Sequence, residues 1–259
     1  RFKEGEPYYE LSRKTGEAFA KAGFTVLTGG GPGAMEAANR GAADSGAESI
    51  GLNIVLPHEQ APNSYVTPGL SFQFHYFALR KMHFLLRARA VAVFPGGFGT
   101  QDEGFEALVL IQTGKAALVP VVLVDAPGGT YWQHWRTYVQ AELLRTNMIS
   151  PEDMNLFRVT DDVQVAAKEI TDFYKRYHSS RYVAEKLVLR LNTPLSNQAL
   201  EELNDKYSSI VTAGKIEQWP GPLDGEDNEY PDKVRLTLTF DRRSIGTLRL
   251  LINDVNKLT

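Results

Sequence analysis

A carboxylate follows a glycine-rich turn in the stretch Phe94 to Glu103, which reads Phe-Pro-Gly-Gly-Phe-Gly-Thr-Gln-Asp-Glu. The apolar run from Ala90 to Phe94 predicts a buried parallel strand, and apolar residues recur at helical spacing after the turn. We expect the helix to begin at about Thr100, where free N–H groups and the helix dipole favour an anion. The turn therefore predicts a site for a phosphate or another anion, with a carboxylate beside it.

Spacing alone leaves two interpretations of Glu103 open. Thr100-x-x-Glu103 matches a capping box, in which the Glu103 carboxylate only accepts a hydrogen bond from the Thr100 N–H. Capping boxes are frequent at helix starts, which favours this structural interpretation. The alternative is a carboxylate that does chemistry next to a bound anion.

A second glycine-rich turn, Gly29 to Gly33, also lies between an expected strand and an expected helix. Its spacing is not that of the dinucleotide fingerprint, and no acidic residue ends the following strand. It is not a Walker A loop, because no Gly-Lys-Ser/Thr follows. The functional interpretation is a second anion or ribose contact, and the structural one is a tight turn that needs small residues.

Two adjacent cations, Arg80 and Lys81, lie on an expected helix between the turns, with Arg87 one heptad later. Arginine suits bidentate binding of phosphate or carboxylate, although a solvated basic face is the commoner fate of such residues. Aromatic residues just before Arg80 are suited to stacking on a base, but they are more often core or dimer contacts.

Strands and helices alternate along the first two thirds of the chain. We expect strands over residues 24–28, 49–56, 90–94, 118–124 and 155–160, and helices over residues 7–23, 34–43, 77–89, 131–145 and 161–177, besides the one from Thr100. Asp161 is the expected cap of the helix before residue 177. This pattern predicts an α/β fold with a doubly wound, Rossmann-like parallel sheet. Ligands of such sheets bind beyond the strand C-terminal ends, where both glycine turns lie.

The pattern changes near residue 180. Strands are expected over 187–191, 215–219 and 234–240, and helices over 196–211 and 242–257, with an acidic, Pro/Gly-rich loop over 220–232. We therefore divide the chain into a Rossmann-like nucleotide-binding domain, residues 1–180, and a small α+β domain of unknown role, residues 181–259.

Composition excludes several function classes. A net charge of −3 does not attract nucleic acid in bulk, and no apolar run reaches the length of a membrane span. The absence of cysteine removes disulfides and thiol catalysis, and it fits the cytoplasm, where we expect the protein. The five histidines, at positions 58, 75, 83, 134 and 178, lack metal-ligand spacing.

The combined motifs resemble the Lonely Guy family, long labelled "lysine decarboxylase-like". The resemblance rests on P-G-G-x-G-T-x-x-E at Pro95 to Glu103, on Arg80-Lys81, and on the stretch Gly29 to Ala38, and it covers roughly residues 1 to 178. Many members are regarded as phosphoribohydrolases, which cleave nucleoside 5′-monophosphates such as cytokinin riboside monophosphates into base and ribose 5-phosphate. The resemblance implies such a substrate here, with no cofactor and no metal.

Residue by residue, the resemblance implies that Glu103 and Arg80 are catalytic. The N–H groups of Gly97, Gly99 and Thr100 would hold the phosphate. The full set implied for substrate or phosphate binding is Gly29, Gly30, Gly31, Arg80, Lys81, Pro95, Gly96, Gly97, Phe98, Gly99 and Thr100. The family forms dimers with active sites near the subunit interface, so we expect a homodimer or a higher homo-oligomer.

The sequence departs from short family members in three places. They carry Met-His-x-Arg-Lys, whereas Phe77 to Lys81 lacks the Met-His pair, which bears on base specificity. Leu56 to Gln60 reads Leu-Pro-x-Glu-Gln, as in the long bacterial form. The family's first strand is expected upstream of Arg1.

Two rival functions come from other classes. The same fold family includes a molybdenum-cofactor carrier, so a non-catalytic nucleotide or cofactor carrier is one alternative. A regulatory module, in which the C-terminal domain senses a ligand, is another. Lysine decarboxylation would need pyridoxal phosphate on a Schiff-base lysine, and nothing singles out Lys81 or Lys115 for that role.

Overall fold

The computed structural model describes residues 2–55 and 61–258, which form two compact units. The first unit comprises Arg1–Val109, Val119–Ile149 and Phe157–Glu169. The second comprises Leu110–Leu118, Ser150–Leu156 and Ile170–Thr259. The predicted Leu-Pro-x-Glu-Gln stretch, with His58, lies outside the described residues.

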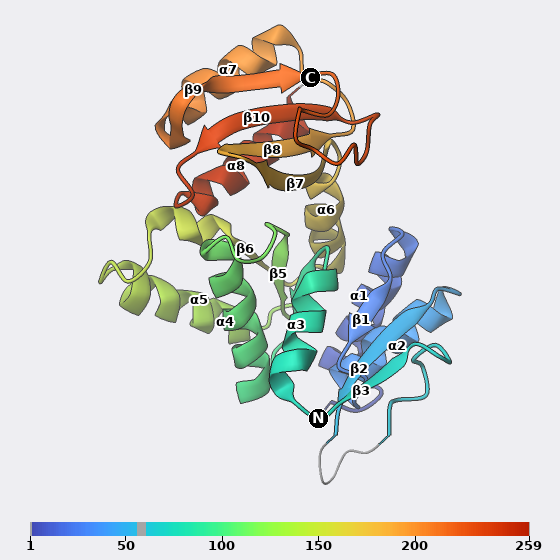
Figure 1. Cartoon of the computed structure of the whole chain (residues 1–259). Helices are drawn as coiled ribbons and strands as arrows, with labels where there is room; N and C mark the ends of the chain where they lie inside the picture. Colours follow the sequence, from blue (N-terminus) through green and yellow to red (C-terminus); the bar gives the residue numbers. More distant parts are fainter. Residues whose placement is uncertain (1, 56–60, 259) are drawn as a thin grey trace. The chain divides into compact units, whose positions relative to one another are not determined.

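Two parallel three-stranded sheets form the centre of the first unit, in the orders β1-β2-β3 and β4-β5-β6 (Figure 1). Their strands are β1 (Val26–Thr28), β2 (Ser49–Ile54), β3 (Ser71–Phe74), β4 (Val91–Val93), β5 (Val121–Val124) and β6 (Phe157–Thr160). Val91 pairs with Val121, so the C-terminal ends of β4 and β5 lie at the same edge. All four residues of β5 are buried, which explains its continuous apolar sequence.

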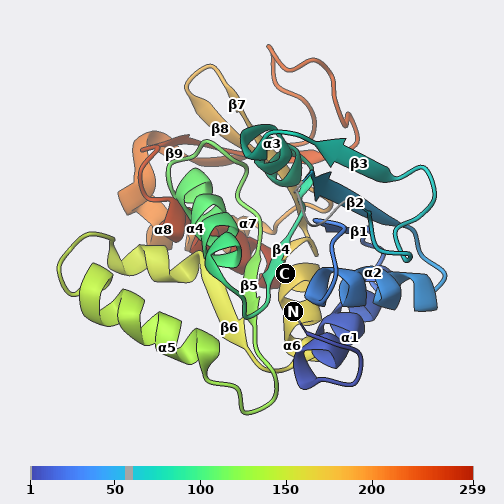
Figure 2. The same cartoon turned by 90° about the horizontal axis from the view of Figure 1, so that it is seen from below.

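Helices connect these strands. They are α1 (Pro7–Lys21), α2 (Ala34–Asp44), α3 (Phe77–Arg87), α4 (Phe98–Gln112), α5 (Tyr131–Tyr138) and α6 (Val163–Phe173), and α5 continues as a π-helical turn, η1 (Val139–Leu144). Helices α1 and α2 pack against each other next to β1, as Figures 1 and 2 show. Parallel strands with helical crossovers confirm the predicted α/β, Rossmann-like fold.

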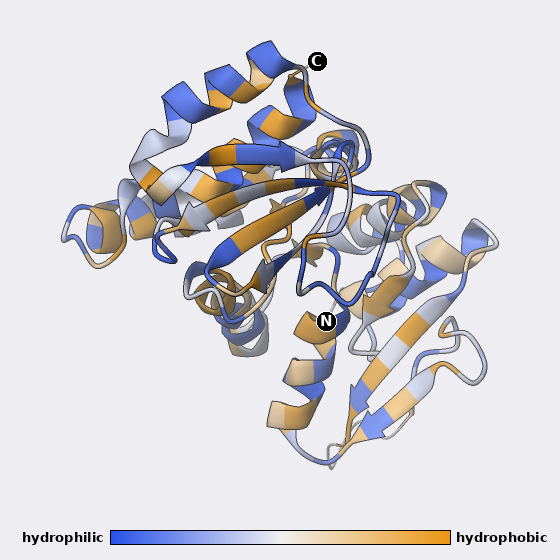
Figure 3. Cartoon of the chain, turned by 45° about the horizontal axis from the view of Figure 1, so that its top comes forward, coloured by the Kyte–Doolittle hydropathy of each residue, from blue (hydrophilic) through white to orange (hydrophobic). Residues whose placement is uncertain are grey.

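The second unit contains an antiparallel sheet in the order β7-β8-β10-β9. Its elements are η2 (Pro151–Asn155), β7 (Tyr177–Val183), β8 (Lys186–Leu191), α7 (Asn197–Tyr207), η3 (Ser208–Ile210), β9 (Val211–Trp219), β10 (Val234–Phe240) and α8 (Ile245–Lys257). Polar and apolar residues lie side by side along these strands (Figure 3). The run β8-α7-β9-β10-α8 places β10 between β8 and β9, which is a split β-α-β arrangement.

An acidic loop, residues 220–233, folds onto a buried arginine of this sheet. The Arg235 side chain is fully buried and donates to both oxygens of Glu226 and to the carbonyls of Glu229, Tyr230 and Lys233. Arg190 also donates to Glu226, at 3.1 Å. Burial alone raises the pKa of Glu226, but the bonds from Arg235, the Leu223 N–H and Arg190 outweigh it and lower the pKa to about 2.

The structure corrects two helix starts. Helix α4 begins at Phe98 rather than at Thr100, because the Gly97 carbonyl already accepts from Thr100 N (3.1 Å) and Gln101 N (3.2 Å). The cap of α6 is Asp162 rather than Asp161. Asp162 Oδ1 accepts from the N–H groups of residues 164 and 165, as an N-cap does, whereas Asp161 accepts from Gly128 N.

Two strands were not predicted. β3 was expected to lead directly into the following helix, but it pairs in parallel with β2. Its sequence, Ser-Phe-Gln-Phe, alternates polar and apolar residues, but the strand has only four residues and its first three are exposed. β7 begins at Tyr177, where the preceding helix was expected to end, and it pairs with β8 in antiparallel register. Helix α6 ends at Phe173 instead.

Candidate active site

The turn between β4 and α4 presents free amides at a helix start. Among the described residues, the N–H groups of Gly97, Phe98 and Gly99 have no hydrogen-bond partner, whereas the Thr100 N–H donates to Gly97 O. A Cβ on Gly96 would lie 2.2 Å from Thr100 Oγ1, so only glycine fits under that side chain. The free donors are thus residues 97, 98 and 99, whereas the Thr100 N–H, which was also expected to hold the phosphate, is used within the turn.

Arg80 and Glu103 form an ion pair between α3 and α4, which lie side by side in Figures 1 and 2. Arg80 Nη2 donates to Glu103 Oε1 at 3.1 Å, and the side chains are 14 % and 33 % exposed. The guanidinium lies over the rings of Phe77 and Phe84, 5.5 and 5.6 Å from their centroids. The pair is therefore rigidly held on the arginine side and open to solvent on the carboxylate side.

This geometry contradicts the capping-box interpretation of Glu103. In a helix that begins at Phe98, Thr100 is the third residue, and Glu103 lies in the second turn. The carboxylate bonds to Arg80, and the Thr100 N–H bonds to Gly97 O. Glu103 is therefore not a cap of its own helix.

Lys81 makes two further ion pairs between the same helices. Its Nζ lies 2.6 Å from Asp102 Oδ2 and 3.0 Å from Glu106 Oε2, and the side chain is only 15 % exposed. Burial alone lowers the pKa of Lys81, but the hydrogen bonds to both carboxylates outweigh it and raise the pKa. Lys81 therefore fixes α3 against α4, and its charge is already compensated.

The second glycine turn, Gly29 to Gly33, lies next to Arg80. A Cβ on Gly29 would be 3.6 Å from Arg80 Nη1 and 2.6 Å from Met35 Sδ. Gly30 has φ of +69°, and a Cβ there would lie 2.2 Å from the Asn53 amide oxygen. The structure thus brings Gly29, Arg80 and Glu103 together, from three different segments of the chain.

Comparison with known proteins identifies the family. The family model described as "possible lysine decarboxylase" matches residues 35–170, just over half of the chain. The chain belongs to this family. The match confirms the relationship to the Lonely Guy family that the sequence motifs indicated, and it includes Arg80 and the turn before α4. No curated protein matches the chain.

Several solved structures are similar to this member of the family. The molybdenum cofactor carrier protein of Chlamydomonas reinhardtii is 19 % identical, with 63 % of this chain and 86 % of that chain covered and a TM-score of 0.45. The molybdenum cofactor binding protein of Rippkaea orientalis is 18 % identical, with 66 % of this chain and 90 % of that chain covered and a TM-score of 0.47. The protein TM1055 is 24 % identical, with 64 % of this chain and 89 % of that chain covered and a TM-score of 0.47.

The remaining residues implied by the family resemblance differ in their surroundings. Pro95, Gly30 and Gly31 are buried, and the Gly31 carbonyl accepts from the Asn63 side chain at 3.2 Å. Phe98 is 95 % exposed at the start of α4. Arg87, one heptad beyond Arg80, is exposed and takes no part in the ion pairs that Arg80 and Lys81 make with α4.

No described helix of this family member is long and apolar enough to cross a membrane.

Sequence reasoning missed two residues that hold the glycine turns. Tyr131, the first residue of α5, donates from its hydroxyl to Gly96 O and accepts from Gln101 Nε2, both at 2.6 Å. Asn63 donates its N–H to Gly30 O at 2.8 Å and its side chain to Gly31 O. The available signal for Tyr131 was its position after β5, because β5 ends beside β4 and the segments after neighbouring parallel strands lie at the same edge of the sheet.

An apolar surface lies on α3, where no residue is buried. Leu79, Met82 and Leu86 follow helical spacing and are 49 %, 56 % and 74 % exposed. Phe72, Tyr76 and Phe77 just before them are 47 %, 70 % and 52 % exposed. An apolar stripe of this kind is typical of an interaction surface.

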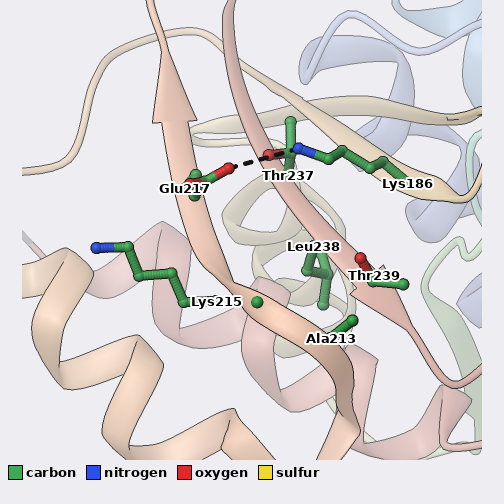
Figure 4. Close-up of a pocket in the computed structure, with 8 residues that line it drawn as sticks. Lys186, Ala213, Lys215, Glu217, Thr237, Leu238 and Thr239 are labelled. Carbon is green, nitrogen blue, oxygen red and sulfur yellow. Dashed lines mark hydrogen bonds and ion pairs between the residues drawn. The ribbon is translucent and has the colours of Figure 1, made fainter.

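A hollow lies on the antiparallel sheet of the second unit. It has a volume of about 520 Å³ and lies along β8, β9 and β10 (Figure 4). Its cation, Lys186, is paired with Glu217 at 3.5 Å above Thr237, and Lys215 extends away from Ala213 and Thr239. Glu217 therefore compensates the charge of Lys186 in this hollow.

Proposed function

We propose that the protein is a hydrolase that cleaves the N-glycosidic bond of nucleoside 5′-monophosphates, of the AMP or cytokinin riboside type. The products are the free base and ribose 5-phosphate. One observation carries the proposal: Glu103, which pairs with Arg80 at 3.1 Å, lies in the second turn of the helix whose start presents three free amides. An anion subsite and a carboxylate thus occur within two helical turns.

The phosphate subsite is the start of α4. The free N–H groups of residues 97 to 99 and the positive end of the helix dipole favour a doubly charged phosphate. Glu103 lies five residues beyond Phe98, or roughly 7.5 Å along the helix axis at 1.5 Å per residue. A sugar bound by its 5′-phosphate at the amides can therefore extend its anomeric carbon toward the carboxylate.

In the reaction, the bond between the anomeric carbon and the base nitrogen breaks, and the water oxygen bonds to that carbon. One water proton ends on the departing base, so the atoms balance. The sugar passes through an oxocarbenium-like transition state, as in other glycoside cleavages. The Glu103 carboxylate stabilises the developing positive charge and orients or deprotonates the water.

Arg80 orients Glu103 and binds the ligand. Its Nη2 holds Glu103, while its Nε is buried without a hydrogen-bond partner among the described residues. A buried donor without a partner is costly, and a bound ligand or water relieves the cost. This orphan donor supports a role of Arg80 in contacting the sugar hydroxyls or the phosphate.

Lysine decarboxylation, which the family description suggests, does not fit the lysines of this site. A Schiff-base lysine needs a lowered pKa, so that the neutral amine can attack. The pKa of Lys81 is raised by its two carboxylate partners, and Lys115 is exposed. We therefore do not propose chemistry on pyridoxal phosphate.

A carrier of a nucleotide or of the molybdenum cofactor is the rival function. Binding of an anionic ligand alone needs no carboxylate beside the anion subsite, whereas hydrolysis uses one. The position of Glu103 therefore favours the hydrolase.

We also propose that a second copy of the chain covers the apolar stripe on α3. The stripe lies on the helix that carries Arg80, so dimerisation through it would enclose the site and exclude water from it.

The test is incubation of the protein with AMP and other nucleoside monophosphates, followed by chromatography of the products. We expect free base and ribose 5-phosphate in equal amounts. Recovery of every nucleotide intact, together with protection of the protein against heat, would contradict hydrolysis and favour the carrier.

A further inference from the structure

The side chain of Tyr131, the first residue of α5, holds the turn before α4. Its hydroxyl donates to the carbonyl of Gly96 at 2.6 Å and accepts from the Gln101 side chain, also at 2.6 Å. The hydroxyl thus joins the last part of the turn to the first turn of α4. Nothing in the family comparison assigns a role to this residue.

The start of α5, where Tyr131 lies, is itself anchored on β5. Asp125 directly follows β5, is almost fully buried, and accepts from Trp132 N at 3.2 Å. The Tyr131 ring meets the Trp132 ring edge-on, with centroids 4.8 Å apart. The hydroxyl is therefore held at a fixed place relative to the sheet that carries the turn.

The peptide that Tyr131 holds joins two glycines, Gly96 and Gly97. A peptide between two glycines rotates at little steric cost, because neither residue has a Cβ. It is trans, so its carbonyl and its N–H point in opposite directions. Fixing the Gly96 carbonyl on Tyr131 therefore also fixes the direction of the Gly97 N–H, away from Tyr131.

That N–H is the first of the three free donors at the start of α4. Gly97 N has no partner among the described residues, and a Cβ built on Gly97 would meet no atom within 4 Å. The chain of hydrogen bonds from Gln101 through Tyr131 to the Gly96 carbonyl also polarises the peptide. Such polarisation strengthens its N–H as a donor.

We propose that Tyr131 is a positioning residue for the phosphate subsite: it locks the Gly96–Gly97 peptide so that the Gly97 N–H donates to the phosphate of the ligand. The inference rests on the phosphate subsite of the proposed function, but not on cleavage of the ligand. Tyr131 itself does not contact the phosphate.

The experiment measures the affinity of the full chain for AMP, ribose 5-phosphate and adenosine by calorimetry, in the wild type and in Tyr131→Phe. Loss of one orienting hydrogen bond weakens binding of AMP and ribose 5-phosphate about threefold to tenfold. Adenosine, which has no phosphate, binds Tyr131→Phe as it binds the wild type. If Tyr131 had only a structural role, the substitution would weaken the affinity for all three ligands alike. If the protein turns over AMP, KM rises more than kcat falls.

Two further variants act as controls. Tyr138→Phe removes another hydroxyl from the same helix, on a side chain that is 52 % exposed, and should leave all affinities unchanged. Gln101→Met removes the donor to Tyr131 but keeps the bond to Gly96, so it should weaken AMP binding less than Tyr131→Phe. It also tests the inference if Tyr131→Phe does not fold.

The outcomes separate this inference from the proposed function. Equal affinity of AMP for Tyr131→Phe and the wild type would overturn the inference alone. Binding of AMP without cleavage, but with the expected loss in Tyr131→Phe, would overturn the hydrolase and keep the role of Tyr131. Failure of the wild type to bind any of the phosphorylated ligands would overturn both.

Discussion

The guanidinium of Arg80 lies 3.1 Å from the carboxylate of Glu103 and joins helix α3 to helix α4 beside two glycine-rich turns. Its Nη1 is also close to Gly29, at 3.6 Å from the position of a Cβ there. One arginine thus contacts the proposed catalytic carboxylate and borders the second glycine turn. The chemistry of the site should therefore depend on this side chain as strongly as on the carboxylate.

Replacement of Arg80 should abolish most turnover. Arg80→Lys keeps the charge but loses the planar fork that reaches Glu103 while lying over Phe77 and Phe84. We expect a loss of about a hundredfold to a thousandfold in kcat. The matched control is Arg87→Lys, on the exposed end of the same helix, which should retain wild-type kinetics. A fully active Arg80→Lys would remove Arg80 from the mechanism.

Lys81 should stabilise the packing of α3 on α4, with a dependence on alkaline pH. Its folded-state pKa is raised above the unfolded value of about 10.4, so its contribution is fully present below that pH. The contribution is lost as the pH rises through the higher folded value. Lys81→Met should therefore lower the thermal midpoint at pH 7, and the difference from wild type should shrink above about pH 10.4.

Thermal unfolding of both proteins from pH 7 to pH 11.5 checks this prediction. A difference that is constant across the range would show that lost packing of the lysine stem, rather than its charge, causes the change.

Glu226 should be important for the stability of the C-terminal sheet. Its side chain is fully buried between Arg190 and Arg235, so Glu226→Gln leaves two buried cations under-compensated. We expect a loss of about 3 kcal/mol in the free energy of unfolding. Asp227→Asn, which changes a neighbouring carboxylate that is 82 % exposed, should cost much less.

The contribution of Glu226 should also vary with acid pH. Its folded-state pKa of about 2 is below the unfolded value of about 4.3, so the stabilisation is present above pH 4.3 and lost as the pH falls toward 2. Denaturant unfolding at pH 7 and pH 3 measures it. Equal stabilities of Glu226→Gln and Asp227→Asn at pH 7 would contradict the account.

The apolar stripe on α3 should determine the oligomeric state. Leu86 is 74 % exposed, and Leu86→Glu places a charge in the surface that we propose a second copy covers. Light scattering after size exclusion should give at least twice the chain mass for the wild type and a lower mass for Leu86→Glu. A monomeric wild type would show that the stripe does not hold two copies together.

Most of the first unit was predictable from local patterns. The apolar run of β5 is buried as expected, whereas in β4 only Val93 is buried. The alternation of strands and helices indicated the fold class. The predicted helix boundaries were wrong where two local signals for a helix start lay close together. Thr100 has the residue type of a cap, but Gly97 starts the helix with its backbone carbonyl, which no side-chain pattern reveals.

The sequence indicates candidate residues for the site but not the contacts between them. Arg80 and Glu103 are 23 positions apart, and their pairing depends on how α3 packs against α4, which spacing does not define. The same holds for Tyr131 and Asn63, which reach the glycine turns from distant segments. Single residues of common type carry no local signature of such tertiary contacts.

The turnover of AMP by Glu103→Gln, compared with wild type and Asp102→Asn, tests the central claim most directly. Glutamine keeps the size of Glu103 but removes the charge that stabilises the oxocarbenium ion. Asp102, the neighbouring carboxylate, pairs with Lys81, whereas Glu103 pairs with Arg80. The account predicts base release by the wild type and by Asp102→Asn, and a loss of about a hundredfold to a thousandfold in folded Glu103→Gln. Near-wild-type turnover in Glu103→Gln would contradict it.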